Sequence, residues 1–168
     1  MEAVGSAATI LQLVSFTGEV LVAGYGYLSK VQKAPPEIRS LLKEAANLNA
    51  LLDQLQTLVT EDPSPHVISA IETLTYLDVF GDCRSLVKVI LKSIKECEQI
   101  SSQGARNFGR RLLWPFKEKE IKETMEQLGR LRETLSAAVA VDSAQATLSV
   151  PIEAKHQPKI SQKNFDKC

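Results

Sequence analysis

Apolar residues recur every three or four positions along most of the chain, and no stretch alternates apolar with polar residues. This period is typical of helices that pack by one face, whereas alternation is typical of strands. The pattern therefore predicts an all-α fold: an antiparallel helical bundle of four long helices plus one short helix. The predicted helices are Ser6–Lys33, Pro36–Thr60, Ser64–Tyr76, Cys83–Ser102 and Lys117–Ala146.

Four of these helices show a clear apolar face that we expect to form the core. The expected core positions are, by helix, Ile38, Leu41, Ala45, Leu48, Leu52, Leu55 and Val59; Val67, Ile68, Ile71, Leu74 and Leu77; Leu86, Val87, Ile90, Leu91, Ile94 and Cys97; and Ile121, Met125, Leu128, Leu131, Leu135 and Val139.

Local signals set the expected boundaries. Pro35-Pro36 cannot continue the first helix, and Pro36 suits the first turn of the second. We expect Gly81 to break the third helix and Asp82 to cap the fourth. The helical pattern stops after Leu148, so residues 1–148 are predicted to form one domain. Residues 149–168 are predicted to be a linker or flexible tail toward a downstream domain.

The first predicted helix is unusually apolar. Glu2 and Glu19 are its only charged residues before Lys30, and an acidic start does not suit a secretory signal peptide. Such a segment is too apolar for a helix with one face in water, and Glu19 makes it marginal as a membrane span. Two interpretations stay open: a core helix packed against the second, fourth and fifth helices, or a segment stored in the bundle that can enter a bilayer. The candidate membrane-inserting residues are Ile10, Leu11, Leu13, Val14, Phe16, Glu19, Leu21 and Val22.

Composition excludes several classes of function. The chain has 168 residues, of which 44% are hydrophobic, and its 20 basic residues balance its 20 acidic ones. A balanced charge argues against general nucleic-acid binding. The three cysteines show no metal-ligand spacing, and we expect Cys83 and Cys97 to be reduced and to face the core. No nucleophile–base arrangement or nucleotide-binding loop is evident, so we expect no enzyme activity and no cofactor.

A basic and aromatic segment precedes the last predicted helix. It contains Arg106, Arg110 and Arg111, followed by Trp114 and Phe116. The two aromatic residues could close one end of the bundle. Alternatively, the segment could dock on an anionic membrane surface or on a partner protein.

Three parts of the chain carry a family resemblance. Residues 1–13, Tyr25–Lys30 and the run into Trp114-Pro115-Phe116-Lys117 resemble the N-terminal domains of fungal NACHT-type signalling NTPases, which are STAND proteins related to NLR-like immune receptors. Residues 164–168 are similar to the junction that precedes the NTPase in such proteins. The domain is thus identified as HeLo-like.

The resemblance implies an effector domain for regulated cell death and heterokaryon incompatibility. It implies that oligomerisation by the downstream NACHT-type NTPase frees the first helix, here Ser6–Tyr27, which then permeabilises the plasma membrane. The implied partners are other copies of the chain, anionic membrane lipids and that NTPase, and the implied location is the cytoplasm with relocation to the plasma membrane. The alternative is a helical adaptor for homotypic or partner-protein contacts without membrane activity.

Glu19 has two interpretations of its own. A carboxylate near the middle of a membrane costs about 2.5–3.5 kcal/mol. In an oligomer it could line a water-filled pore as an acidic ring that favours cations. In the folded bundle it could instead pair with a basic residue at the edge.

Overall fold

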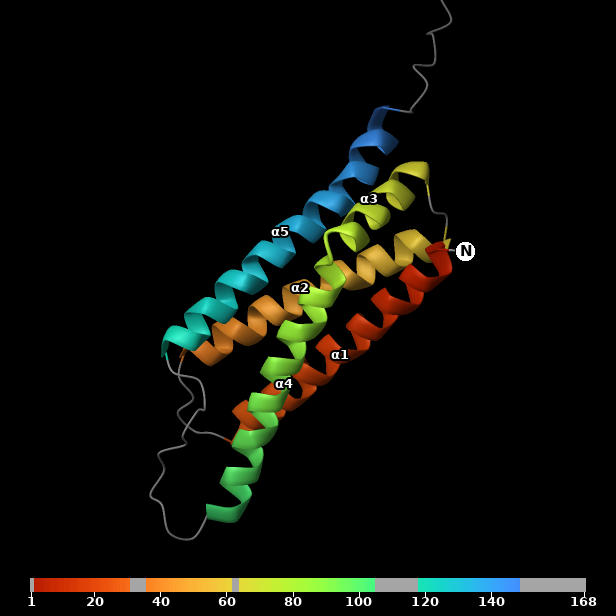
Figure 1. The fold of residues 1–168 in the computed structure, drawn as a ribbon. Coiled ribbons are helices and arrows are strands. Elements are labelled where there is room, and N and C mark those ends of the chain that lie inside the picture. Colours follow the sequence, from red (N-terminus) through yellow and green to blue (C-terminus); the bar gives the residue numbers. More distant parts are fainter. Residues whose placement is uncertain (1, 31–35, 62–63, 105–117, 149–168) are drawn as a thin grey trace, which may run out of the picture.

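A computed structural model describes residues 2–30, 36–61, 64–104 and 118–148 of the chain. Within these ranges the regular elements are all α-helices, which confirms the all-α class. Figure 1 shows the helices α1 (Glu2–Lys30), α2 (Pro36–Glu61), α3 (Pro65–Tyr76), α4 (Val79–Gly104) and α5 (Glu118–Leu148).

The helices α1 and α5 lie on opposite sides of the bundle. α1 packs mainly against α2 and α4 and touches α3 only slightly, whereas α5 packs against α2, α3 and α4. No contact between α1 and α5 occurs in the part of the chain that the structure describes. The expected contact of the first helix with the fifth is therefore wrong. The helix α1 therefore has only two substantial neighbours, α2 and α4.

Helix direction is only partly as expected. α1 and α2 follow one another in the chain and run in opposite directions (Figure 1). In contrast, α1 and α4 run parallel, because Gln12 contacts Arg84 near the start of both helices and Lys30 contacts Glu98 toward their ends. A short loop reverses consecutive helices only, so it does not set the direction of helices that are distant in the sequence.

The junction between α3 and α4 lies earlier than expected. α3 ends at Tyr76, and Asp78 has a left-handed backbone with φ of 52°. Asp tolerates this conformation better than most residues. The backbone N–H of Asp82 donates to the carbonyl of Asp78 at 3.0 Å, so Asp82 lies inside α4 and does not cap it. Gly81 is also helical, and the Asp78 carboxylate lies so close to its Cα that a Cβ would collide with it.

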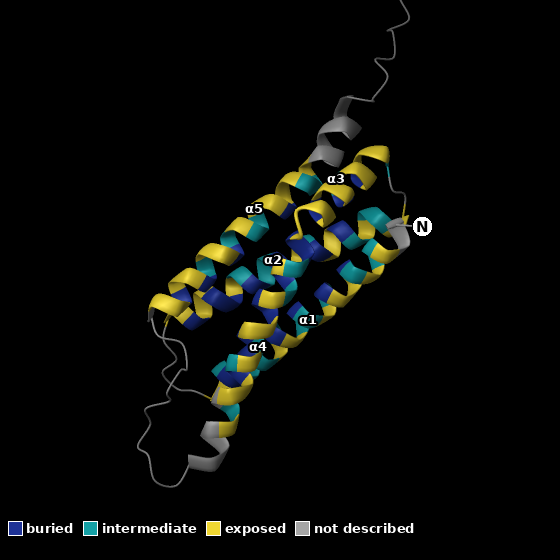
Figure 2. Cartoon of the chain, in the orientation of Figure 1, coloured by how far each residue is buried: buried dark blue, intermediate teal, exposed yellow. Residues whose placement is uncertain are grey.

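The predicted core is largely confirmed (Figure 2). Two expectations are wrong: Ile68 and Leu77 are exposed at 37% and 57%. The early start of α4 instead buries Val79 and Phe80. The expected residues that are buried are Ile38, Leu41, Ala45, Leu48, Leu52, Leu55, Val67, Ile71, Leu74, Leu86, Val87, Ile90, Ile94, Ile121, Leu128 and Leu135. Those that are partly buried against the core are Val59, Leu91, Met125, Leu131 and Val139. The structure does not describe the side chain of Cys97.

Candidate functional site

One stripe of α1 forms part of the core. Its positions recur every three or four residues, and they face α2 and α4, the two main neighbours of α1. The stripe includes a threonine and a glycine as well as large apolar residues. Its buried members are Ile10, Leu13, Thr17, Val20, Gly24 and Tyr27.

The opposite side of α1 is exposed to solvent. Leu11, Val22 and Tyr25 are exposed at 51%, 78% and 51%, and Ala8 and Ser15 lie on the same side. The expectation that this segment could not keep one face in water is therefore wrong. Small and hydroxyl side chains between the large ones make a mostly uncharged exposed face tolerable.

The structure divides the predicted membrane-inserting residues between these two sides. Ile10 and Leu13 are fully buried, whereas Leu11, Val22 and Glu19 are exposed. The remaining three residues are partly buried and pack against the core from the edges of α1: Val14, Phe16 and Leu21.

Two contacts fit α1 closely to α2. The Thr17 hydroxyl lies 2.5 Å from Oδ1 of Asn49 and 2.8 Å from the Leu13 carbonyl oxygen, so this buried polar group is satisfied. Gly24 lies against the side chain of Leu42, where an added Cβ would collide with the leucine methyl groups. Leu42 is fully buried, so it has little room to move aside. Gly24 thus allows the close approach of α1 to α2.

Two polar contacts join α1 to α4. Nη2 of Arg84 donates to Oε1 of Gln12 at 2.7 Å, and Nζ of Lys30 lies 3.2 Å from Oε1 of Glu98. Nε of Arg84 is buried and has no hydrogen-bond partner among the described residues. Both contacts are solvent-exposed, so burial of the apolar stripe supplies most of the attachment of α1.

Glu19 lies on the exposed side of α1. It is seven residues after Gln12 and eleven before Lys30, spacings that place it on the edge of α1 that borders α4. No ion pair of Glu19 occurs within residues 2–30, 36–61, 64–104 and 118–148. The expected pairing with a basic residue at the bundle edge is therefore not found in these ranges.

Several predicted features lie outside the described residues. They are the basic and aromatic residues Arg106, Arg110, Arg111, Trp114 and Phe116, and the predicted tail at 149–168.

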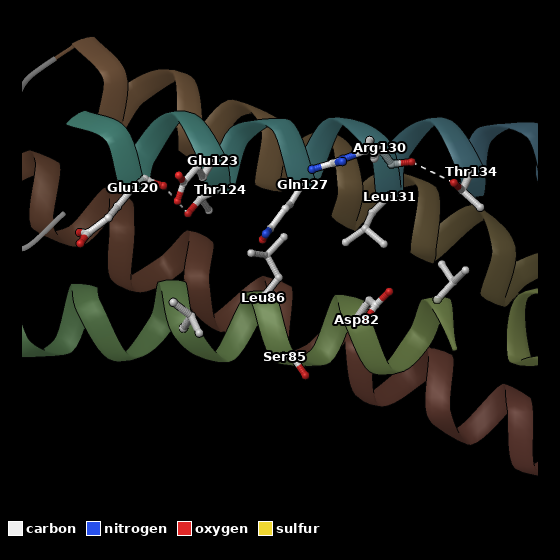
Figure 3. Close-up of a pocket in the computed structure, with 12 residues that line it drawn as sticks. Asp82, Ser85, Leu86, Glu120, Glu123, Thr124, Gln127, Arg130, Leu131 and Thr134 are labelled. Carbon is white, nitrogen blue, oxygen red and sulfur yellow. Dashed lines mark hydrogen bonds between the residues drawn. The ribbon is translucent and has the colours of Figure 1, made fainter. Parts of the chain in front are cut away.

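A groove lies between α4 and α5 and has a volume of about 740 Å³. Leu86 and Leu131 point into the space between the two helices, while Ser85 points away from α5 (Figure 3). Neither histidine nor cysteine is among the residues that line it. The hydroxyl groups that line this groove therefore have no histidine base among the other lining residues.

The titratable and metal-ligating side chains that the structure describes show no sign of a reactive thiol or a metal site. Burial, assisted by the neighbouring Asp82 charge, raises the pKa of the Cys83 thiol to about 12. This thiol is therefore protonated and unreactive near neutral pH, as expected for a core cysteine. Across the described ranges, no group of three or more His, Cys, Asp or Glu residues could hold a metal ion.

Among the described helices, α1 is the candidate for a membrane span. The segment Gly5–Lys30 is long and apolar enough to cross a bilayer. Of an apolar stretch of 18 residues within it, 28% is buried in the bundle. The central helix of a soluble protein can be equally apolar, but it is mostly buried. Comparison with models of protein families, with curated proteins and with solved structures gives no match for this chain.

Proposed function

We propose that the chain is the N-terminal effector domain of a fungal NLR-like receptor and that it permeabilises the plasma membrane to cause regulated cell death. In the resting state, α1 stays in the bundle and the protein is cytoplasmic. When the downstream NACHT-type module brings several copies together, α1 leaves the bundle and enters the membrane. The role is not enzymatic and needs no cofactor.

The observation that carries this proposal is the incomplete burial of a helix that could span a membrane. The segment Gly5–Lys30 has 26 residues, which corresponds to roughly 39 Å of helix against a hydrocarbon thickness of about 30 Å. Only 28% of its 18-residue apolar stretch is buried, and the bundle leaves an apolar surface with Leu11, Val22 and Tyr25 exposed to water. A bilayer would cover that surface completely.

The energetics are compatible with a helix α1 that is held in the bundle of the monomer and released when an oligomer forms on a membrane. Releasing α1 exposes the large buried side chains Ile10, Leu13, Val20 and Tyr27. At about 1.5–3 kcal/mol for each side chain, this cost keeps α1 in the bundle of a monomer. Hydrocarbon would bury the same side chains again, so an oligomer on a membrane can compensate for the loss.

Glu19 suits a water-filled pore better than a lipid contact. It is near the middle of the Gly5–Lys30 segment, where a carboxylate facing lipid would cost about 2.5–3.5 kcal/mol. In an oligomer of released helices, Glu19 would face the lumen and form an acidic ring that favours cations.

Leakage of dye from anionic vesicles tests the proposal. The protein is compared as a monomer and as an oligomer enforced by a fused coiled coil. Release by the oligomer and not by the monomer is the expected result. If neither form releases dye, the domain does not permeabilise membranes.

A second candidate function is a helical adaptor that binds a partner protein or another copy without membrane activity. The exposed side chains Leu11, Val22 and Tyr25 favour it, because they are spaced along one side of α1 as in helix–helix interfaces. This function predicts protein association through that side, with α1 remaining in the bundle and vesicles remaining intact.

A further inference from the structure

The side of α4 that borders α1 is basic. Every charged residue between Asp82 and Glu96 is a cation: Arg84, Lys88, Lys92 and Lys95. The whole chain has no net charge, so this row is a local excess.

The register of α1 and α4 places most of this row beside α1. Positions 84, 88, 91, 95 and 98 are three or four residues apart, so they lie along one side of α4. Arg84 and Glu98 lie on this side and contact α1. The exposed side chains Lys88 and Lys95 lie between these two contacts on the same side.

The side chains of Lys88 and Lys95 are available to an external anion. Lys88 and Lys95 have no ion pair with any described residue, whereas Lys92 lies 3.8 Å from Glu96 and Lys30 pairs with Glu98. A lysine without a carboxylate partner can approach phosphate groups without first breaking an ion pair.

An apolar and nearly uncharged strip runs alongside the basic row. It is the exposed side of α1, with Leu11, Val22 and Tyr25 as its large side chains and Glu19 as its carboxylate. Because α1 and α4 run parallel and in contact, one flat partner can touch both helices.

We propose that these two helices form a docking face for anionic lipid surfaces on the folded bundle, before α1 is released. The face consists of Leu11, Val22 and Tyr25 on α1 and Arg84, Lys88 and Lys95 on α4. An anionic membrane offers both parts of the required chemistry, since its phosphates attract the cations and its acyl boundary accepts the apolar side chains. This inference rests on the proposed membrane function and adds the residues that dock and the orientation of the bundle.

Vesicle flotation of the intact monomeric chain tests the docking face. We expect binding to phosphatidylcholine vesicles that contain phosphatidylserine, weakening as salt screens the charges, and no binding to phosphatidylcholine alone. The double variant Lys88→Glu/Lys95→Glu should reduce binding at least about 30-fold, because each lysine near an anionic surface contributes about fivefold. The control Lys43→Glu/Arg130→Glu changes net charge equally on other helices and should bind like the wild type. Equal losses in both double variants would overturn the proposal.

The apolar half of the docking face is tested with its own pair of variants, one on the face and one elsewhere. Val22→Ser should weaken binding several-fold, while Tyr76→Ser, at a side chain that is 89% exposed on α3, should leave binding unchanged. A concentration-dependent dimer that Val22→Ser abolishes, together with no vesicle binding, would show that a second copy occupies the face and would contradict lipid docking.

Hydrogen exchange of α1 amides separates this inference from the proposed function. Vesicle-bound monomer should keep these amides as protected as in solution, since docking uses the folded bundle. Binding that occurs only with loss of this protection would overturn the docking face, because released α1 would then be the binding element. Docking with protected amides, but without leakage by the enforced oligomer, would reject permeabilisation and retain the docking face.

Discussion

Nη2 of Arg84 donates a hydrogen bond of 2.7 Å to Oε1 of Gln12, and this contact joins the first half of α1 to the start of α4. Together with the pair of Lys30 and Glu98, it fixes the parallel register of the two helices. These contacts are solvent-exposed, so they guide the position of α1 without making its release prohibitively costly. The attachment of α1 should therefore respond to single substitutions.

Removing the amide of Gln12 should loosen α1. Gln12→Ala deletes the acceptor for Arg84, whose Nε already has no hydrogen-bond partner among the described residues. We expect a loss of about 0.5–1.5 kcal/mol in the free energy of unfolding and faster hydrogen exchange in α1. Gln54→Ala, at an exposed position of α2, is the control and should change neither quantity. Equal stability of the two variants would show that the contact contributes nothing.

The close approach of α1 to α2 at Gly24 can be tested with paired glycine variants. Gly24→Ala drives a methyl group into the buried Leu42 side chain and should destabilise the bundle by about 1–3 kcal/mol. Gly26→Ala meets no atom within 4 Å and should stabilise α1 by up to about 1 kcal/mol, because alanine favours helices. Urea unfolding measures both. A Gly24→Ala protein as stable as Gly26→Ala would contradict this packing.

The two sides of α1 should separate folding from membrane activity. Leu11→Glu and Val22→Glu change exposed positions, so both variants should fold but lose dye release in the enforced oligomer. Leu13→Glu buries a charge in the core and should unfold the protein. Circular dichroism and vesicle leakage measure the two effects. A folded Val22→Glu oligomer that still releases dye would exclude α1 as the inserting helix.

Glu19 should control ion selectivity if the released helices form a pore. Glu19→Gln removes the proposed acidic ring, and the exposed position makes a folding defect unexpected. Reversal potentials in planar bilayers should show a cation preference for the wild type and its loss in the variant. Unchanged selectivity would reject the acidic ring.

The Cys83 thiol gives a prediction for stability against pH. Its pKa is raised from 9.0 to about 12 by burial, so between these values the unfolded chain loses a proton that the folded chain keeps. The contribution is complete below pH 9 and is lost as pH rises toward 12. Wild-type stability should thus fall more steeply over this range than that of Cys83→Ala. Identical slopes would show that Cys83 is accessible to water.

The sequence predicted those parts of the fold that depend on local periodicity. The spacing of Leu41, Leu48 and Leu55 is sufficient to identify the buried face of α2. At the α3–α4 junction, by contrast, Gly81 looked like the helix breaker. A helix tolerates glycine, and Asp78 adopts the left-handed conformation instead. Periodicity marks faces well, but it does not decide between two adjacent breaking residues.

The arrangement of α1 was only partly predictable from the sequence, because a local pattern does not show which side of a helix its neighbours cover. The apolar character of α1 was evident, yet composition does not reveal that Leu13 is buried while Leu11 is half exposed. Thr17 and Gly24 were overlooked because they are not apolar anchors, although both fit the three–four spacing of the buried stripe. The contacts of Arg84 and Glu98 with α1 depend on the parallel register, which no local pattern encodes.

A reversible covalent tether tests most directly whether α1 must leave the bundle. Gln12→Cys and Arg84→Cys, whose native side chains are in hydrogen-bond contact, can be joined by a short cleavable bismaleimide. Cys97 and Cys168 are replaced by serine, while the buried Cys83 can stay. We predict that the tethered oligomer leaves anionic vesicles intact and that cleavage of the tether starts dye release. Equal release before and after cleavage would contradict the account, because the membrane would then be permeabilised with α1 still held against α4.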